Sequence, residues 1–418
     1  MNTNITKQLP VGVDNFKKLI EGFYFVDKTH FIANLLDSYS EVSLITRPRR
    51  FGKSLILSML EYFFTIDNAK DNRALFNDLK ISKFDKNYMV RQGKSPVILI
   101  SLKDIDADDF DTFVNRFAIE ISDIAMNLLY LLDHPIIKKY YITNFKRLCD
   151  QEATIEQLGV SLKFLTKLLY IYHHKKVILL IDEYDSPIVN AWNKKYYDKC
   201  ISFMKNFLGS CLKSNKYLDF AVLTGITRMA KESIFSGVDN FSVFSVFDDA
   251  FSDVFGFTEE EVVKFLDYYN ISDKVVEVKE WYGGYQFGNK GIYNPCSIVN
   301  YIRNKYYYNA EPTGYWVNTS RNVIINYILQ SDGSFIKEGI EELMKHNSIS
   351  KLINENLGYG QITTSVNALF LMLISSGYLK IVNKMRRGNR WSCTLTIPNK
   401  EVYEAFEVEI SEMLPTEC

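Results

Sequence analysis

The sequence predicts an α/β fold in which helices cover both faces of a mostly parallel sheet. Four short apolar runs have the character of buried strands, at residues 42–45, 96–102, 177–181 and 220–224. Strands buried on both faces have continuous apolar sequence, and strands separated by helices connect in parallel. A fifth run, residues 241–247, alternates less cleanly and is a further strand candidate.

Length and composition restrict the class of protein. A chain of 418 residues is too long for one compact core, so two or three domains are expected. Apolar residues make up 47% and charged residues 24%, a mix typical of globular proteins. The formal net charge of −1 excludes a global field that attracts nucleic acid or an anionic membrane. Any such binding requires a local patch.

Cysteine usage and hydropathy indicate a cytoplasmic protein without a membrane segment. The six cysteines form no C-x-x-C pair and the histidines lack metal-ligand spacing, so neither a disulfide framework nor structural zinc is expected. The first ten residues lack the apolar core of a signal peptide. The longest apolar runs, such as residues 369–374, are far too short to span a membrane.

Changes in pattern along the chain predict three domains. Residues 1–254 hold the strands and several helices, including helices near 29–38 and 155–172 and a long helix that begins in the acidic stretch 104–111. Residues 255–346 read as a helical, lid-like domain, opened by a capping box between Thr258 and Glu261. Residues 347–418 contain helices and then a hairpin around residues 387–389, which together resemble a winged-helix module.

A phosphate-binding loop is predicted at residues 45–54, between the first strand and a helical pattern. Gly52 lets the main chain approach phosphate, Lys53 reaches the β- and γ-phosphates, and the Ser54 hydroxyl ligates Mg²⁺. The helix N-terminus adds main-chain N–H groups and a positive dipole. The other predicted contacts of the nucleotide in this loop are Arg49, Arg50, Phe51 and Leu55.

Acidic and polar side chains end two later strands, where α/β sheets place their sites. Asp182 is suited to hold Mg²⁺ through water beside Ser54, and Glu183 to orient or deprotonate the attacking water. The intervening run 96–102 supplies the inserted strand of the glutamate-using class of P-loop enzymes. Thr224 and Arg228 follow as contacts of the γ-phosphate or the water. The fold expected for residues 1–254 is therefore a P-loop NTPase core.

Each of these assignments has a structural alternative. Arg47, Arg49 and Arg50 either add phosphate contacts or form a solvated basic turn. Thr224 is equally suited to cap a strand end. Arg228 is either a γ-phosphate contact or a solvated surface cation, and the phosphate contact is the preferred assignment. Asp185 either supports the metal ligands or caps the following helix, and the cap is the preferred assignment.

Several motifs together resemble the bacterial AAA-ATPase-like family. They are residues 24–29, 47–54, 181–185, 223–228, 255–261, 281–288, 293–295, 315–320, 376–379 and 397–402. The resemblance spans nearly the whole chain, and Arg47 at the first glycine position belongs to the family pattern. It implies that residues 24–29, including Asp27, line the adenine side. Members commonly continue into a PD-(D/E)XK nuclease domain, but the tail here lacks the acidic strand pair and Glu-x-Lys of that chemistry, so nuclease activity is not expected.

Two functions remain open. One is an ATP-binding, Mg²⁺-dependent ATPase that acts as a nucleotide-controlled regulatory switch. The other is an ATP-binding module with little turnover, which docks DNA or a protein partner through its C-terminal region and the basic hairpin turn 384–391. A solvated charged turn is the plain alternative for that hairpin. The sequence leaves open the oligomeric state and whether Arg228 acts in its own site or across a subunit boundary.

Overall fold

The computed structural model describes residues 7–228, 235, 241–316, 334–355 and 365–411. The chain divides into two compact units that interleave along the sequence. The sheet unit consists of Asp27–Ile45 and Ser54–Val243, and the loop unit of Met1–Val26, Thr46–Lys53 and Phe244–Cys418. The division into residues 1–254, 255–346 and 347–418 stays a prediction.

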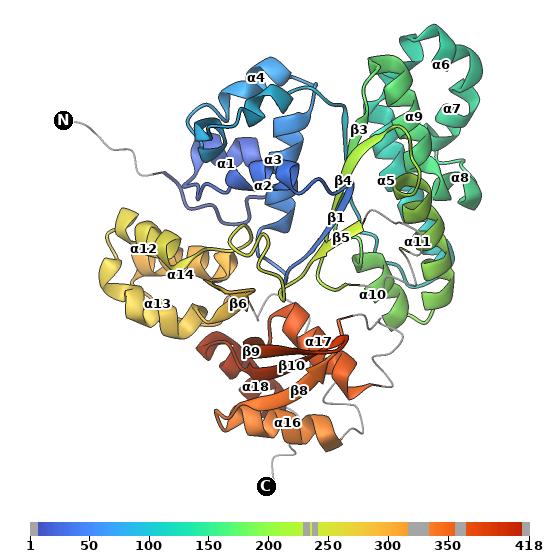
Figure 1. Ribbon diagram of the computed structural model, residues 1–418. Coiled ribbons are helices and arrows are strands. Elements are labelled where there is room, and N and C mark those ends of the chain that lie inside the picture. The colour runs from blue at the N-terminus through green and yellow to red at the C-terminus, as the bar shows by residue number, and fades with distance from the viewer. Residues whose placement is uncertain (1–6, 229–234, 236–240, 317–333, 356–364, 412–418) are drawn as a thin grey trace, which may run out of the picture. The chain divides into compact units, whose positions relative to one another are not determined.

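The sheet unit is built on a five-stranded sheet with the order β2-β3-β4-β1-β5 (Figure 1). Its neighbours β2 and β3 pair in parallel, as do β3 and β4. The strands are β1 (Val42–Thr46), β2 (Val97–Ser101), β3 (Val177–Asp182), β4 (Leu218–Gly225) and β5 (Phe241–Phe244). Every residue of β1 and β3 is buried, as their continuous apolar sequence predicts. All five predicted strands are thus confirmed.

The position of β2 in the sheet differs from its place in the chain. The run that the sequence places between the phosphate-loop strand and β3 is β2, and it lies at the edge of the sheet. The strand that separates β1 from β3 in space is β4, which ends in Thr224 and Gly225. Crossover helices let a later strand insert between earlier ones, so order along the chain does not fix order in the sheet.

Helices cover both faces of this sheet, as the sequence predicts (Figure 1). Helices α2, α3 and α4 lie on one side and α5 to α11 on the other. Their bounds are α2 (His30–Asp37), α3 (Lys53–Phe64), α4 (Ala69–Ala74), α5 (Phe110–Asn127), α6 (Pro135–Tyr140), α7 (Ile142–Cys149), α8 (Ile155–Gly159), α9 (Ser161–His173), α10 (Ser186–Asn193) and α11 (Tyr197–Leu212), with short 3₁₀ turns at Lys80–Lys83, Tyr88–Arg91 and Leu129–Asp133.

The helix expected over residues 155–172 is two helices, α8 and α9, which meet at Val160. A capping box between Thr154 and Gln157 starts α8, and leucines of both helices, among them Leu158 and Leu162, are buried. The 3.6-residue periodicity continues across the break, which is why the pattern alone does not reveal it.

The loop unit contains a group of helices beside a small hairpin. Its members are α1 (Phe16–Gly22), α12 (Glu259–Tyr268), a 3₁₀ turn (Ser272–Lys274), α13 (Val275–Tyr282), β6 (Tyr285–Phe287), β7 (Lys290–Ile292) and α14 (Pro295–Tyr308). The predicted capping box between Thr258 and Glu261 starts α12. Helix α1 is not among the predicted helices, and the Asn15 side chain caps it by accepting from the Lys18 N–H.

The last part of the loop unit is a three-stranded antiparallel sheet with the order β8-β10-β9. Its elements are α16 (Ser334–Met344), β8 (Ile349–Ile353), α17 (Val366–Ser376), β9 (Lys380–Arg387), β10 (Arg390–Thr396) and α18 (Lys400–Ser411). The β9–β10 hairpin is the predicted one. The sequence does not predict β8, which is short and carries alternating polar residues.

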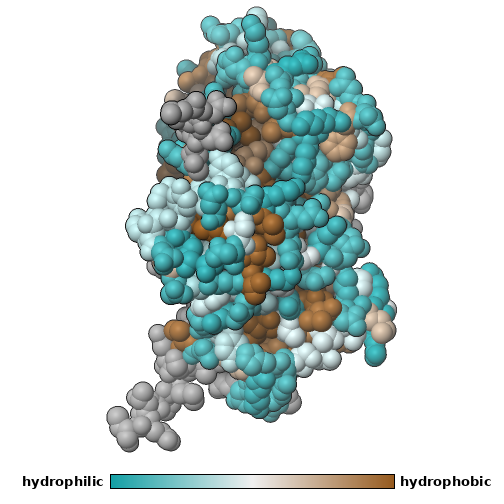
Figure 2. Space-filling model, turned by 90° about the vertical axis from the view of Figure 1, so that its left-hand side faces the viewer, coloured by the Kyte–Doolittle hydropathy of each residue, from teal (hydrophilic) through white to brown (hydrophobic). Residues whose placement is uncertain are grey.

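Figure 2 shows one face of the molecule, on which hydrophilic side chains predominate and hydrophobic ones form small separate areas. Among the described residues, every helix is too short or too polar to cross a membrane.

Candidate functional site

The predicted phosphate loop is a tight turn between the end of β1 and the first residue of α3. Gly52 adopts a φ of +86°, in the left-handed region that favours glycine. A Cβ at Gly52 would meet nothing within 4 Å, so the conformation of the main chain, and not crowding, requires glycine there. Arg50 also has a positive φ, 63°, which is uncommon for a residue with a side chain.

The Lys53 side chain is buried and points back onto its own loop. Its Nζ donates to the carbonyl oxygens of Arg47, at 3.2 Å, and Pro48, at 2.9 Å. These contacts hold the ammonium group at the loop that is predicted to receive phosphate. A phosphate oxygen would compete with the two carbonyls for the same cation.

The Arg47 side chain does not reach solvent, so its interpretation as part of a solvated basic turn is wrong. The side chain is fully buried. Its guanidinium donates to the carbonyls of Thr46, Phe244 and Phe251, at 2.8, 3.0 and 3.3 Å. It also lies over the rings of Phe255 and Phe287, at 5.6 and 5.0 Å from their centroids. Partners more than 190 residues away in sequence explain why a local pattern does not reveal this role.

The other residues of the loop differ in exposure. Arg49 and Arg50 are exposed, and Arg50 Nη1 donates to Cys296 Sγ at 3.3 Å. The Phe51 ring is buried and packs against Tyr285 and Phe287, each with 5.2 Å between centroids. Phe51 therefore offers a ligand its main chain and not its side chain. Leu55 is partly buried in the first turn of α3.

Three predicted site residues of the sheet unit, Ser54, Asp182 and Thr224, are joined by hydrogen bonds to the Asp182 carboxylate. This aspartate is buried at the end of β3. Ser54 Oγ donates to Asp182 Oδ2 at 2.5 Å, and Thr224 Oγ1 donates to Asp182 Oδ1. The Thr224 hydroxyl also accepts from the Glu183 N–H at 3.4 Å. Thr224 is fully buried and ties the ends of β3 and β4 together.

The donor set around Asp182 fits Mg²⁺. Ser54 and Asp182 offer a hydroxyl and a carboxylate oxygen, and Mg²⁺ prefers one or two such ligands together with water and phosphate oxygens. A hydroxyl can rotate from donating to the carboxylate to binding a cation through its lone pairs. In the described part of the chain, no cluster of three or more His, Cys, Asp or Glu could hold a metal ion, so any metal site here would combine a carboxylate with other oxygen ligands.

Glu183 follows Asp182 and is partly buried. Its φ is 49°, a left-handed conformation that costs a side-chain-bearing residue about 1–2 kcal/mol. Strained main chain of this kind concentrates at functional sites, where the surrounding structure enforces it. The main-chain bond to Thr224 and the turn at Glu183 together fix where its carboxylate leaves the chain.

Asp185 corrects the preferred assignment from the sequence. It occupies the cap position of α10, but its side chain makes no cap hydrogen bond. Instead, Oδ2 accepts from the N–H groups of Ile226 and Thr227 and from the Thr227 hydroxyl, at 2.9 to 3.0 Å. Asp185 therefore fixes the segment that follows β4. Pro187 stands in the first turn of α10, where the fixed φ of proline suits a helix start.

Tyr184 supports the same segment and has no counterpart in the sequence predictions. It is fully buried, and its hydroxyl donates to the Thr227 carbonyl at 2.8 Å. A Cβ on Gly225 would collide with the Tyr184 ring, so glycine is required for the close approach. Arg228 follows this segment and is partly buried, and its Nε is buried without a hydrogen-bond partner among the described residues.

The Asp27 carboxylate, predicted to contact the adenine side, accepts hydrogen bonds from other residues of the sheet unit. One carboxylate oxygen accepts from the Thr29 N–H and hydroxyl at 2.8 and 2.7 Å, and the other from the Lys80 N–H at 2.7 Å. The Thr29 side chain makes no hydrogen bond that caps α2. Tyr24 of the same motif belongs to the loop unit, where it stacks on Phe265 at 4.2 Å.

Comparison with known proteins agrees with the resemblance seen in the motifs. The family model described as "Predicted AAA-ATPase" matches residues 10–235, more than half of the chain. A protein of Azotobacter chroococcum mcd 1, named "Uncharacterized protein in vnfD 5'region", is 27% identical over 401 residues. That match covers 95% of this chain and 68% of the other protein. The chain therefore belongs to the AAA-ATPase-like family.

Proposed function

We propose that this protein binds ATP with Mg²⁺ at the phosphate loop and hydrolyses it, as a nucleotide-controlled regulatory switch. The observation that carries the proposal is the hydrogen-bonded group formed by Ser54, Asp182 and Thr224. It joins the second residue of the helix after the phosphate loop to the ends of two buried strands. Membership of the AAA-ATPase-like family supports nucleotide binding independently.

In this proposal Lys53 exchanges the carbonyls of Arg47 and Pro48 for the β- and γ-phosphate oxygens. The main-chain N–H groups of the loop and the first turn of α3 hold the phosphates against the positive helix end. Ser54 and Asp182 hold Mg²⁺, which neutralises charge on the phosphates. Arg49 and Arg50 add phosphate contacts from their exposed positions.

The residues after β3 and β4 serve the attack of water. Glu183 orients and deprotonates the water, from a turn fixed by its main-chain bond to Thr224. Arg228 stabilises charge on the γ-phosphate, and Asp185 and Tyr184 fix the segment that leads to it. Residues 255–346 act as the helical lid in the same proposal.

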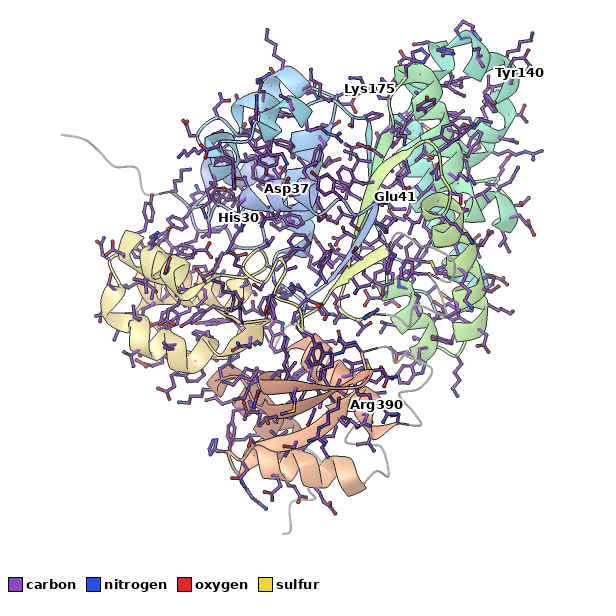
Figure 3. The ribbon with its side chains drawn as sticks, viewed as in Figure 1. His30, Asp37, Glu41, Tyr140, Lys175 and Arg390 are labelled. Atoms are coloured by element: carbon purple, nitrogen blue, oxygen red, sulfur yellow. The ribbon has the colours of Figure 1, made fainter. Side chains whose placement is uncertain are left out.

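The binding step is tested by Lys53→Ala and titration with ATP in the presence of Mg²⁺. The substitution is expected to weaken binding about 100-fold or more, because the ammonium group carries the main charge on phosphate. Lys175→Ala is the matched control, since Lys175 is an exposed lysine of the sheet unit (Figure 3). Equal affinity of wild type and Lys53→Ala would place the phosphates elsewhere.

The hydrolysis step is tested by phosphate release from wild type and Glu183→Gln. The amide keeps the size of the side chain but accepts no proton, so turnover should fall about 100-fold while ATP affinity is kept. Glu152→Gln, at an exposed glutamate, serves as the control. If both wild type and Glu183→Gln release phosphate at the background rate while binding ATP, the protein is not an ATPase.

A second candidate function is favoured by the β9–β10 hairpin. In this second function, the protein is an ATP-binding module with little turnover that docks DNA through the winged-helix-like residues 347–418. The hairpin exposes Arg386, Arg387 and Arg390, of which Arg390 is labelled in Figure 3. The Arg386 guanidinium lies 5.2 Å from the Trp391 ring centroid. Two apolar side chains of the same hairpin, Val382 and Met385, are 57% and 61% exposed.

Titration with duplex DNA at several salt concentrations tests this second function. Binding through the hairpin predicts an affinity that falls steeply with salt and a slope reduced by about 1 for each arginine removed. Arg387→Ala and Arg390→Ala are the informative variants, and Arg147→Ala, at an exposed arginine of α7, is the control. Salt-independent or undetectable binding would remove the DNA version.

A further inference from the structure

The inference concerns Arg47, whose side chain connects the phosphate loop to a distant segment of the loop unit. Its guanidinium donates to carbonyls of Phe244 and Phe251, which are 197 and 204 residues away in sequence. A third bond, to the Thr46 carbonyl, fixes the end of β1. One side chain thus joins the start of the loop to both ends of residues 244–251.

Burying the Arg47 guanidinium carries a desolvation cost in free energy. Burial lowers the pKa of Arg47 to about 10, since removing the cation from water disfavours its charged form. Its hydrogen-bond partners are carbonyl dipoles and not a carboxylate. An apolar side chain of similar size would avoid this desolvation cost, and such replacements of buried charges are often neutral or stabilising. Packing alone therefore does not explain an arginine here.

The guanidinium does what an apolar side chain cannot. Its planar fork presents several donors in fixed directions, so it holds carbonyls of two segments at once. The Arg47 carbonyl in turn accepts from Lys53 Nζ at 3.2 Å. The same residue therefore contacts residues 244–251 through its side chain and the phosphate-binding lysine through its main chain.

A second connection runs in parallel a few residues further along. The Gly256 N–H donates to the Phe51 carbonyl at 3.1 Å. Gly256 has a φ of +88°, and a Cβ there would collide with Ile292 and press on the Phe51 ring. Phe287, which lies over the Arg47 guanidinium, also packs on Phe51. The loop and residues 244–256 consequently share one set of contacts.

We propose that Arg47 is a positioning residue that couples the phosphate loop to residues 244–256, so that this segment sets the affinity for ATP and ATP binding orders the segment in return. The inference rests on the proposed function, because it concerns the affinity of the same loop. Arg47 does not contact nucleotide itself. By linkage, a change in the conformational equilibrium of residues 244–256 alters ATP affinity, and ATP binding alters that equilibrium by the same factor.

The experiment measures ATP affinity and amide hydrogen exchange in the full chain, for wild type, Arg47→Lys and Arg47→Met. Both variants should bind ATP about 10-fold more weakly, because neither supplies the fork that holds three carbonyls. In wild type, saturating ATP should slow exchange at the Gly256 amide, and in Arg47→Met this protection should disappear. Arg147→Met, the same change at an exposed arginine, should leave both measurements unaltered.

The two readouts separate the outcomes. Loss of ATP-dependent protection at Gly256 is an effect that a purely structural role would not produce, and it supports the coupling. Unchanged affinity and unchanged protection in Arg47→Met overturn it. If Arg47→Met does not fold, Phe287→Leu decides in the same way, since it removes the ring over the guanidinium and keeps an apolar side chain. Wild type that does not bind ATP removes the proposed function instead.

Discussion

Asp182 in the sheet unit and Arg47 in the loop unit are both buried charges, but their partners differ in kind. Asp182 accepts from two hydroxyl groups, those of Ser54 and Thr224. Arg47 donates to three main-chain carbonyls and lies over two phenyl rings. Hydroxyl groups rotate at little cost, whereas carbonyls move only with the main chain. Asp182 thus has exchangeable partners and Arg47 has fixed ones.

Two further buried carboxylates belong with Arg47 in this comparison. Asp185 accepts from the main-chain N–H groups of Ile226 and Thr227. Glu401, in α18, accepts from those of Tyr315 and Trp316 at 2.6 and 2.7 Å. Their partners cannot turn away to bind something else. The difference separates charges that hold the fold from a charge that is free to serve chemistry.

The largest expected effect is on activity and follows from the exchangeable partners of Asp182. Asp182→Asn should lower Mg²⁺-dependent ATP turnover about 1000-fold, because an amide is a poor partner for the metal. The free energy of unfolding should change by less than about 1 kcal/mol, since both hydroxyls can reorient. Activity assays with urea unfolding measure the two quantities. A loss of several kcal/mol would show that Asp182 is structural and break the comparison.

Glu401 should show the reverse behaviour. Glu401→Ala leaves the main-chain N–H groups of Tyr315 and Trp316 and the Ser297 hydroxyl without their acceptor, which should cost about 3 kcal/mol of unfolding free energy. Urea unfolding of this variant and of the exposed control Glu407→Ala measures the difference. A cost equal to that of Glu407→Ala would mean that water replaces the carboxylate.

The pH dependence of stability is a smaller test of the same residue. Burial raises the pKa of Glu401 above its ordinary value of 4.5, so the folded state keeps a proton that the unfolded state has released. Stability should therefore fall as the pH rises from about 4.5 through the raised pKa. Glu401→Gln has no such group and should lose less stability over that window. Parallel pH profiles of wild type and Glu401→Gln would contradict this.

The smallest expected effect concerns the left-handed turn at Glu183. Residue 183 has a φ of 49°, which glycine adopts without strain and alanine only at a cost in free energy. The Glu183→Gly variant should therefore be more stable than Glu183→Ala by about 1 kcal/mol. Both variants should lack turnover. Thermal unfolding compares them, and equal midpoints would show that the strain is released in solution.

The sequence predicts the sheet unit better than the loop unit, for a physical reason. A buried strand is predicted from a short local run of apolar residues. Polar residues at the carboxyl ends of such strands meet at one edge of the sheet, so Ser54, Asp182 and Thr224 are predicted together. The position of β2 at the sheet edge and the role of Arg47 depend on contacts between distant segments. Strand β8 and the Asp185 contacts are missed because short polar strands and loop-to-loop bonds leave no periodic pattern.

The partners of Arg47 also bear on how the chain folds during synthesis. The phosphate loop leaves the ribosome about 200 residues before the carbonyls of Phe244 and Phe251 that its guanidinium contacts. The neighbours of β1 in the sheet are β4 (Leu218–Gly225) and β5 (Phe241–Phe244), so β1 also has no partner strand until late in synthesis. A newly made chain should therefore complete the sheet around β1 and the contacts of its phosphate loop at nearly the same stage, and the Arg47 charge lacks its distant carbonyl partners until then.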